Sequence, residues 1–215
     1  MEASVVVVEG LRERKKRQTR EAIAAAAMTL FRAEGFDAVT VADVARAADV
    51  SEKTIFNYFP AKEDLVFAPD ERWAALVAAI RERPAGESIV APFRRTTMDF
   101  LGRVERDPVD SILAIPRLVA GSASLRNRLH LAWEEESAVL TPVIAAQAGE
   151  GTGDLMPAVV ARTLAWTHRL TFRSAFTRLL AGEDQHAVAG DLRAQATRAY
   201  AALEAGLGDY GTGAG

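Results

Sequence analysis

The segment SEKTIFNYFPAKEDL, residues 51–65, contains side chains that can bind a polyanion. Lys53 and Lys62 can neutralise phosphate groups, and the hydroxyl of Thr54 can hydrogen-bond a phosphate oxygen. Asn57 can pair with adenine through two hydrogen bonds, and Lys53 can reach guanine. The segment therefore predicts a short helix that buries one side and shows the other to a phosphate-rich partner.

The elements that would position these groups have local start signals. Ser51 is a good N-cap, and Ile55 and Phe59, four residues apart, would point inward together. Thr40 opens a T-x-x-D capping box with Asp43, just ahead of another short apolar face. Two short helices are therefore expected in succession.

A longer helix is expected before them. Ile23, Ala27 and Phe31 recur at helical spacing, and Gly35 supplies a C-terminal stop. Residues 13–59 thus predict a long helix, a short helix, a three-residue turn and another short helix. This order is the helix-turn-helix layout, whose second helix lies in the major groove. A plain three-helix bundle with no nucleic-acid role has the same spacing and stays open.

The charges are segregated, although the net charge is −3. Residues 12–20 carry six basic residues and one acidic residue, whereas the rest of the chain carries twenty basic and twenty-eight acidic residues. One end of the molecule is therefore expected to meet a polyanion, with a solvated basic tail as the alternative. The run has no interleaved apolar residues, which argues against a membrane-surface or protein-binding helix.

The composition excludes several classes of protein. At 215 residues the chain has room for one or two domains. It has no cysteine, so disulfides and thiolate metal sites are excluded. The apolar run at residues 5–8 is too short for a signal peptide or a membrane span. We therefore expect a cytoplasmic protein with no membrane partner and no cofactor.

Longer helices follow residue 62, with Pro69 expected to bend or break the first of them and a linker at residues 148–157. The last two helices carry much apolar surface, and a helix that is apolar on two sides must be covered on two sides. We expect a four-helix seam between two copies of the chain, with burial inside one chain as the alternative. The predicted seam residues are Leu170, Phe176, Leu192, Ala196, Tyr200 and Leu203.

An enzyme is the main rival class. His130 and Glu134 lie one helical turn apart and could bind a metal, but zinc needs three or four ligands and no second cluster lies nearby in the sequence. The sequence has no GxSxG, P-loop or dinucleotide motif. A helical small-molecule-binding protein or enzyme with no DNA role remains the alternative.

The stretch AEGFDAVTVADVARAADVSEKTIFNYFPAKEDLV resembles the N-terminal DNA-binding domain of the TetR family of bacterial transcriptional regulators, over about residues 13–66. The resemblance implies an all-α protein of about nine helices that is not an enzyme. Residues 1–66 would form a helix-turn-helix domain with a basic N-terminal arm, and residues 67–210 an effector-binding and dimerisation domain. It further implies a homodimer on a palindromic double-stranded DNA operator. Most members repress, and effector binding moves their two DNA-binding heads apart.

By motif position, Thr40 should contact a phosphate, and Tyr58 and Lys62 should hold the DNA backbone. The side chains expected to face the groove are Ser51, Glu52, Lys53, Thr54 and Asn57. Glu52 is ambiguous, because it could accept from cytosine or simply favour the helix N-terminus. The basic segment adds Lys15, Lys16, Arg17 and Arg20 to the predicted DNA-binding residues.

Three residues depart from the family pattern. Asp49 replaces the usual glycine of the turn, and aspartate tolerates a left-handed backbone better than most residues. Phe56 stands where tyrosine is usual, so one phosphate-binding hydroxyl is missing. Ala61 replaces a capping serine, which should cost about 1 kcal/mol of helix stability.

The effector pocket is expected to be mostly apolar with a few polar anchors, and its ligand hydrophobic or amphipathic. The candidate lining residues are Trp73, Phe100, Leu113, Leu118, His130, Trp133, Trp166, His168 and Phe172. The aromatic residues could equally be core, whereas a buried histidine needs a hydrogen-bond partner that a ligand could supply. Arg103, Arg117 and Arg169 could hold an acidic group, although surface positions are favoured for them.

Overall fold

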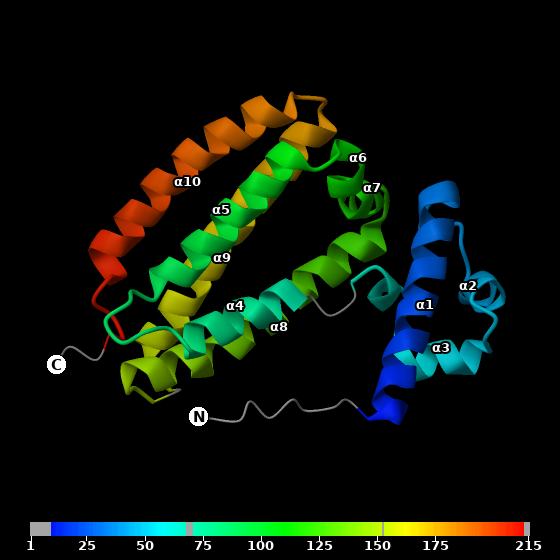
Figure 1. Cartoon of the computed structure of the whole chain (residues 1–215), viewed down its shortest axis with the longest axis horizontal. Coiled ribbons are helices and arrows are strands. Elements are labelled where there is room, and N and C mark those ends of the chain that lie inside the picture. Colours follow the sequence, from blue (N-terminus) through cyan, green and yellow to red (C-terminus); the bar gives the residue numbers. More distant parts are fainter. Residues whose placement is uncertain (1–9, 68–70, 152, 213–215) are drawn as a thin grey trace, which may run out of the picture. The chain divides into compact units, whose positions relative to one another are not determined.

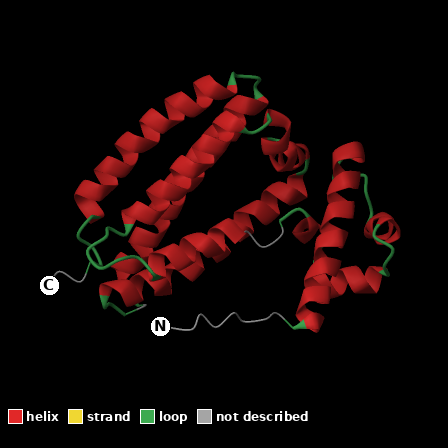
Figure 2. Cartoon of the chain, in the orientation of Figure 1, coloured by secondary structure: helices red, strands yellow, loops and turns green. Residues whose placement is uncertain are grey.

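The computed structural model describes residues 10–67, 71–151 and 153–212, and these residues form an all-helical protein (Figures 1 and 2). They contain ten α-helices and one short 3-10 helix, and within these ranges no strand occurs. The all-α prediction is confirmed. The apolar run at residues 5–8 lies outside the described ranges. None of the described helices combines the length and apolar character needed to cross a bilayer.

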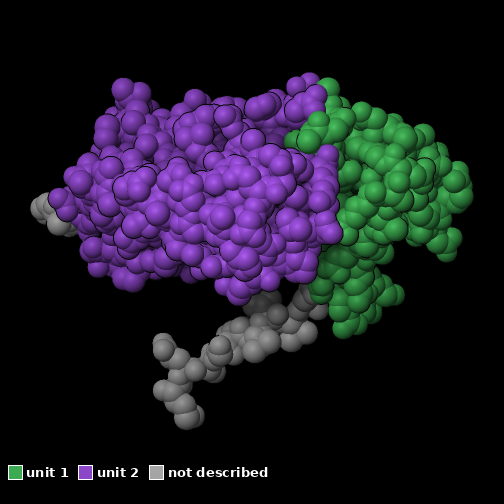
Figure 3. Space-filling model, turned by 90° about the horizontal axis from the view of Figure 1, so that it is seen from above, with its two compact units in different colours: residues 1–69, 118–125 green, residues 70–117, 126–215 purple. Residues whose placement is uncertain are grey.

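The chain divides into two compact units (Figure 3). The first contains residues 1–69 together with 118–125, and the second contains residues 70–117 and 126–215. Residues 118–125 were expected in the second domain. They group with the first unit because Leu118 and Leu125 join its apolar core.

The first unit contains α1 (Leu11–Glu34), α2 (Val41–Ala47), α3 (Glu52–Tyr58) and the 3-10 helix η1 (Lys62–Leu65). Helix α1 packs against α2 and η1, and α2 packs against α3. Ile23, Phe31, Ile55 and Phe59 are fully buried in the shared core. The helices predicted from spacing and caps are therefore confirmed. The basic segment forms the exposed first turns of α1 rather than a separate arm.

The turn between α2 and α3 has a left-handed backbone at Asp49, as the type of this residue suggested. Asp49 has a φ of 53°. Among the described residues, it is the one residue other than glycine that has a positive φ. The N–H group of Val50, just after α2, donates a hydrogen bond to Ala45 O at 3.0 Å. A left-handed residue thus ends α2 and turns the chain into the N-cap of α3.

The second unit is built from longer helices. They are α4 (Glu71–Arg81), α5 (Val90–Arg106), α6 (Val109–Ile112), α7 (Ala114–Gly121, whose last residues belong to the first unit), α8 (Ala123–Ala148), α9 (Leu155–Leu180) and α10 (Gln185–Leu207). The break between η1 and α4 fits the expected interruption, although Pro69 itself lies outside the described residues. A loop lies between α8 and α9 where the linker 148–157 was predicted, although residues 155–157 already belong to α9.

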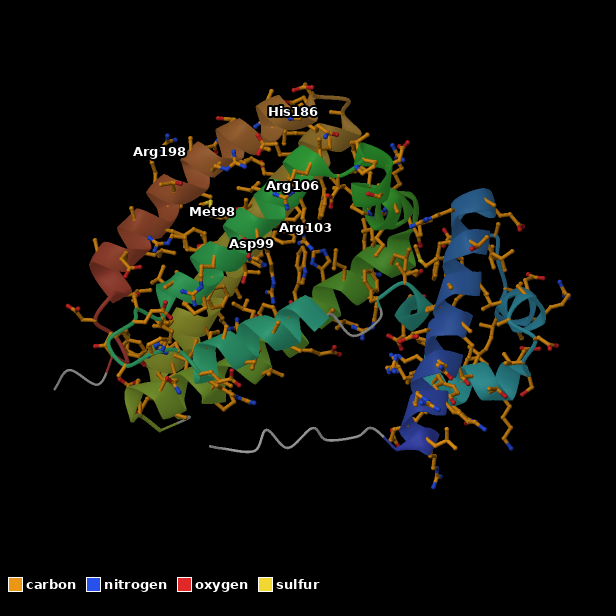
Figure 4. All side chains as sticks on the ribbon, viewed as in Figure 1. Met98, Asp99, Arg103, Arg106, His186 and Arg198 are labelled. Carbon is orange, nitrogen blue, oxygen red and sulfur yellow. The ribbon has the colours of Figure 1, made fainter. Side chains whose placement is uncertain are left out.

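Helices α5, α9 and α10 lie side by side and share the core of the second unit (Figure 1). Outside this core, charged side chains link α5 to α10. Arg193 donates to Glu105 at 2.7 Å, and this hydrogen bond is the largest cause of the lowered pKa of Glu105. Figure 4 shows the side chains of Asp99, Arg103 and Arg106 on α5 and those of His186 and Arg198 on α10.

A polar chain crosses the same core. Thr97 Oγ1 lies 2.7 Å from His168 Nδ1 and 2.8 Å from the hydroxyl of Tyr200, so one hydroxyl joins α5, α9 and α10. Aromatic rings surround it: Phe172 stacks on Phe100 with ring centroids 3.6 Å apart and lies 4.4 Å from His168. The partner that buried His168 needs is thus supplied, at least in part, by the protein itself.

Four of the predicted dimer-seam residues lie on α10 and pack within the single chain. Leu192, Ala196 and Tyr200 are buried inside the single chain, where α10 packs against α5 and α9, and Leu203 packs against the same core. Phe176 likewise contacts the core through an edge-on contact with Phe100, whereas Leu170 is exposed.

Candidate nucleic-acid interface and ligand groove

Helix α3 is fixed at its start and along its inner side. Ser51 caps it, because the Ser51 hydroxyl accepts from Thr54 N–H at 3.1 Å, and the two hydroxyl groups lie 2.8 Å apart. The predicted N-cap is confirmed. Ile55 and Phe59 anchor the inner side in the core. A helix held at its start and along one side presents its outer face in a defined orientation.

That outer face carries the predicted groove-facing residues together. Glu52, Lys53 and Asn57 are exposed on it, with Phe56 between them, and Ser51 is exposed at its start. Thr54 is partly buried and engaged with Ser51. The face therefore combines a lysine ammonium group, an amide and an aromatic ring on a helix narrow enough for a DNA major groove.

Thr40 caps α2 through a reciprocal pair of hydrogen bonds. Its hydroxyl accepts from Asp43 N–H at 3.1 Å, and its own N–H donates to the Asp43 carboxylate at 2.9 Å. The hydroxyl of Thr40 also donates to this carboxylate, which is the largest cause of the lowered pKa of Asp43. The predicted capping box is confirmed, and Thr40 is exposed beside it.

Several of the predicted backbone-contacting residues also hold the unit together. The Arg20 guanidinium donates to Tyr58 O at 3.2 Å and lies 4.6 Å from the centroid of the Phe59 ring. The Lys62 ammonium lies 4.2 Å from the centroid of Phe36. Sequence spacing did not suggest these contacts, because the Arg20–Tyr58 hydrogen bond joins residues 38 positions apart.

The remaining basic residues lie on α1. Lys15 and Lys16 are exposed, and Arg17 forms an ion pair with Glu21 at 3.1 Å. Their charge makes the first turns of α1 a basic surface of the first unit, as the charge pattern predicted.

The second unit contains an open groove of about 330 Å³ between α8 and α9. His130, Trp133 and Trp166 line it, so it brings together three of the nine candidate effector residues. The other lining residues are Glu134, Ser137, Arg162 and Arg169. The groove therefore has aromatic walls with charged groups of both signs.

Arg169 lines the groove but is buried, contrary to the expectation from sequence. It was expected at the surface, yet only 10% of its side chain is exposed. Its guanidinium donates to Trp133 O at 2.7 Å and to Glu136 at 2.9 Å, and it lies 5.6 Å from the Trp133 ring centroid. Its partners on α8 lie more than thirty positions away in the chain, so no local pattern indicated this burial. Arg117, in contrast, is about half exposed and pairs with Asp110.

The other effector candidates lie outside the groove. Phe100, Leu113 and His168 are buried in the core of the second unit, where Phe172 and Trp73 are partly buried against the same cluster. Leu118 belongs to the core of the first unit. Glu134 pairs with Arg162 at 3.4 Å, and within the described ranges no three metal-binding side chains gather around it or His130.

Known proteins resemble this chain over both sequence and fold. Residues 23–68 match the family described as bacterial regulatory proteins, tetR family. The HTH-type transcriptional regulator TcmR of Streptomyces glaucescens is 36% identical over 154 residues, which cover 67% of each chain.

Two solved structures share the fold. Salmonella enterica GusR has a TM-score of 0.52 at 21% identity and covers 94% of this chain and 98% of its own. NalD, the secondary repressor of the MexAB-OprM multidrug efflux pump in Pseudomonas aeruginosa, has a TM-score of 0.53 at 16% identity and covers 86% of this chain and 97% of its own. These two structures show that the whole helical fold, and not only the matched residues 23–68, is that of known proteins. The chain therefore belongs to the TetR family of bacterial regulatory proteins, which are transcriptional regulators and not enzymes.

Proposed function

We propose that this protein is a ligand-responsive transcriptional repressor that binds a palindromic operator as a homodimer in the bacterial cytoplasm. A small hydrophobic or amphipathic effector releases it from the DNA. Repression is the usual activity of the family that the sequence resembles.

The exposed face of α3 carries this proposal. Lys53 and Asn57 lie there side by side on a helix whose opposite side is fixed by Ile55 and Phe59. A lysine and an asparagine can read guanine and adenine edges in the major groove. The basic first turns of α1 supply charge for phosphate contacts.

An exposed apolar stripe on α9 supports the homodimer. Its side chains recur at helical spacing and include Leu170, which the sequence already placed in the seam. They are Leu155, Met156, Val159, Trp166 and Leu170. A row of apolar side chains along one face of a long helix indicates a partner surface. A second copy of the same helix would cover it with matching residues, as two-fold symmetric interfaces do.

The groove between α8 and α9 is the best candidate for the effector site. His130 and Trp133 offer aromatic surface, and Arg169 lies at its wall with buried polar contacts. Apolar walls with a few fixed polar groups are typical of small-molecule sites.

The test of DNA binding is selection of operator sites from a random or genomic library, followed by titration with variants. Two-fold symmetry predicts an inverted repeat whose half-sites lie about 34 Å apart, or a multiple of that distance. Binding should weaken steeply with salt because phosphate contacts release counterions. Asn57→Ala or Lys53→Ala should relax preference at particular bases, whereas Lys62→Ala or Tyr58→Phe should weaken binding to all sequences alike.

The variants also show how the proposal fails. If Asn57→Ala kept the full sequence preference, or if Lys62→Ala affected one sequence only, the assigned contacts would be wrong. A protein that retained no DNA at low salt would favour the alternative, a helical small-molecule-binding protein with no DNA role. Circular dichroism of each variant separates lost contacts from lost folding, which matters for Lys62 because it also packs on Phe36.

A further inference from the structure

Phe56 is an aromatic side chain that α3 leaves in water. Among the described residues of the first unit, the exposed large apolar side chains are Phe56, at 50% exposure, and Leu11, at the start of α1. The neighbouring Ile55 and the nearby Phe59 are buried. The short helix therefore has room in the core for two of its apolar side chains and turns the third outward.

The orientation of Phe56 is fixed by the rest of the helix. The Ser51 cap holds the first turn, and burial of Ile55 and Phe59 holds the inner side. A rotation that buried Phe56 would expose one of these two residues, so it would gain no apolar burial. The ring thus stays on the outer face in the folded protein.

The outer face is otherwise polar. Lys53 precedes Phe56 by one helical turn, and Asn57 follows it directly; both are exposed. Single exposed apolar residues are common and usually need no explanation. Phe56, however, lies among the side chains that the proposed function assigns to base recognition. Its position therefore indicates a DNA base as its partner.

A phenyl ring has no group to hydrogen-bond a phosphate or a base edge. It can contribute only apolar contact, and the apolar group that bases present in the major groove is the C5 methyl of thymine. We propose that Phe56 reads a thymine methyl group in each half-site of the operator. This inference rests on the proposed DNA-binding function and adds an apolar contact that its hydrogen-bonding residues cannot make.

The neighbouring Asn57 makes this reading consistent. An asparagine that pairs with adenine selects an A·T pair, and the thymine of an A·T pair presents its methyl group in the same groove. Phe56 and Asn57 are adjacent on one helix face. The thymine is therefore expected at or within one step of the base pair that Asn57 contacts.

Replacement of thymine by deoxyuridine tests the proposal, because it removes the methyl group and leaves every hydrogen-bonding edge unchanged. Each thymine of the selected operator is replaced in turn, symmetrically in both half-sites, and affinity is measured by fluorescence anisotropy. The wild-type protein should lose about fourfold in affinity for each methyl group that Phe56 buries. The loss should occur at one thymine position per half-site and not at the others.

The matched protein variants assign that loss to Phe56. Phe56→Ala should bind the thymine operator more weakly and should not distinguish thymine from deoxyuridine at the sensitive position. Lys62→Ala is the control: it should bind more weakly overall but keep the full thymine preference. Because Phe56 is exposed, its replacement should leave the thermal unfolding temperature close to that of the wild type.

The outcomes separate this inference from the function beneath it. Sequence-specific binding with no loss at any deoxyuridine position would overturn the inference alone. So would a Phe56→Ala variant that kept the wild-type preference for thymine. Failure of the wild type to bind any sequence selectively would overturn the proposed function, and the inference with it.

Discussion

Tyr200 is fully buried where α5, α9 and α10 meet, and its hydroxyl lies 2.8 Å from Thr97 Oγ1. Burial raises the pKa of Tyr200 to about 12, although the hydrogen bond with Thr97 by itself lowers this pKa. An unfolded tyrosine titrates near pH 10. Between these values the unfolded chain has lost a proton that the folded chain keeps, so the free energy of unfolding falls as pH rises.

This titration predicts a pH-dependent effect of Tyr200→Phe. At pH 8 the variant should be less stable by about 1 kcal/mol, because it loses one buried hydrogen bond. Above pH 10 the wild type loses about 1.4 kcal/mol per pH unit at this site, and the variant does not. The two unfolding free energies, measured in urea, should therefore meet near pH 11. A difference that stayed constant from pH 8 to pH 11 would contradict the assignment. The pKa of Tyr210 is also raised to about 12, but that titration is common to both proteins and cancels.

Single residues were predictable where their cause is local. The caps formed by Ser51 and Thr40 and the left-handed backbone of Asp49 depend on neighbours within three or four positions, which the sequence displays. Arg169 depends on the carbonyl of Trp133 on another helix, and Leu118 on the core of another unit. Such partners are fixed by tertiary packing, so residue type alone did not indicate either of them.

At the scale of the element, the sequences of α9 and α10 likewise do not show which elements pack against them. Both carry apolar residues on more than one side, and this pattern indicates that something must cover them without identifying the cover. The structure shows that α5 and α9 cover Leu192, Ala196 and Tyr200 of α10. The stripe that stays exposed lies on α9, and it includes Val159 and the predicted seam residue Leu170.

A pair of charge substitutions separates the two faces. Val159→Glu should weaken self-association at least tenfold, because each copy would bring a carboxylate into the proposed seam, while the monomer stays folded. Ala196→Glu should instead lower the free energy of unfolding by about 3 kcal/mol or more, because it forces a charge into the packing of α10. Sedimentation velocity and urea unfolding measure the two effects. An unchanged association constant for Val159→Glu would show that α9 does not form the seam.

At the scale of the whole molecule, effector and operator binding must be linked reciprocally. If an effector weakens operator binding by some factor, the operator weakens effector binding by the same factor. A thermal-shift screen of cellular metabolites should find ligands that stabilise the protein, and each should reduce operator affinity by the factor measured in the reverse experiment.

A groove variant tests where such a ligand binds. His130→Ala should reduce the thermal shift and the operator release together, and should leave the operator affinity of the ligand-free protein unchanged. His130 is exposed at the groove, so its loss should disturb the fold little. A ligand that stabilised the protein strongly but left operator affinity unaltered would show that its site does not control DNA binding.

The core of the DNA-binding unit includes residues far along the chain. Leu118 and Leu125 pack with Ile23, Phe31 and Phe59, and Ser122 donates a hydrogen bond to Asp37 at 2.8 Å. During synthesis the ribosome completes the helix-turn-helix segment well before it reaches these residues. We therefore expect part of the apolar surface of this unit to stay uncovered until residue 125 has emerged. A nascent chain stalled before that point should be more open to proteolysis than one stalled after it, and a head grafted onto another regulator should keep residues 118–125.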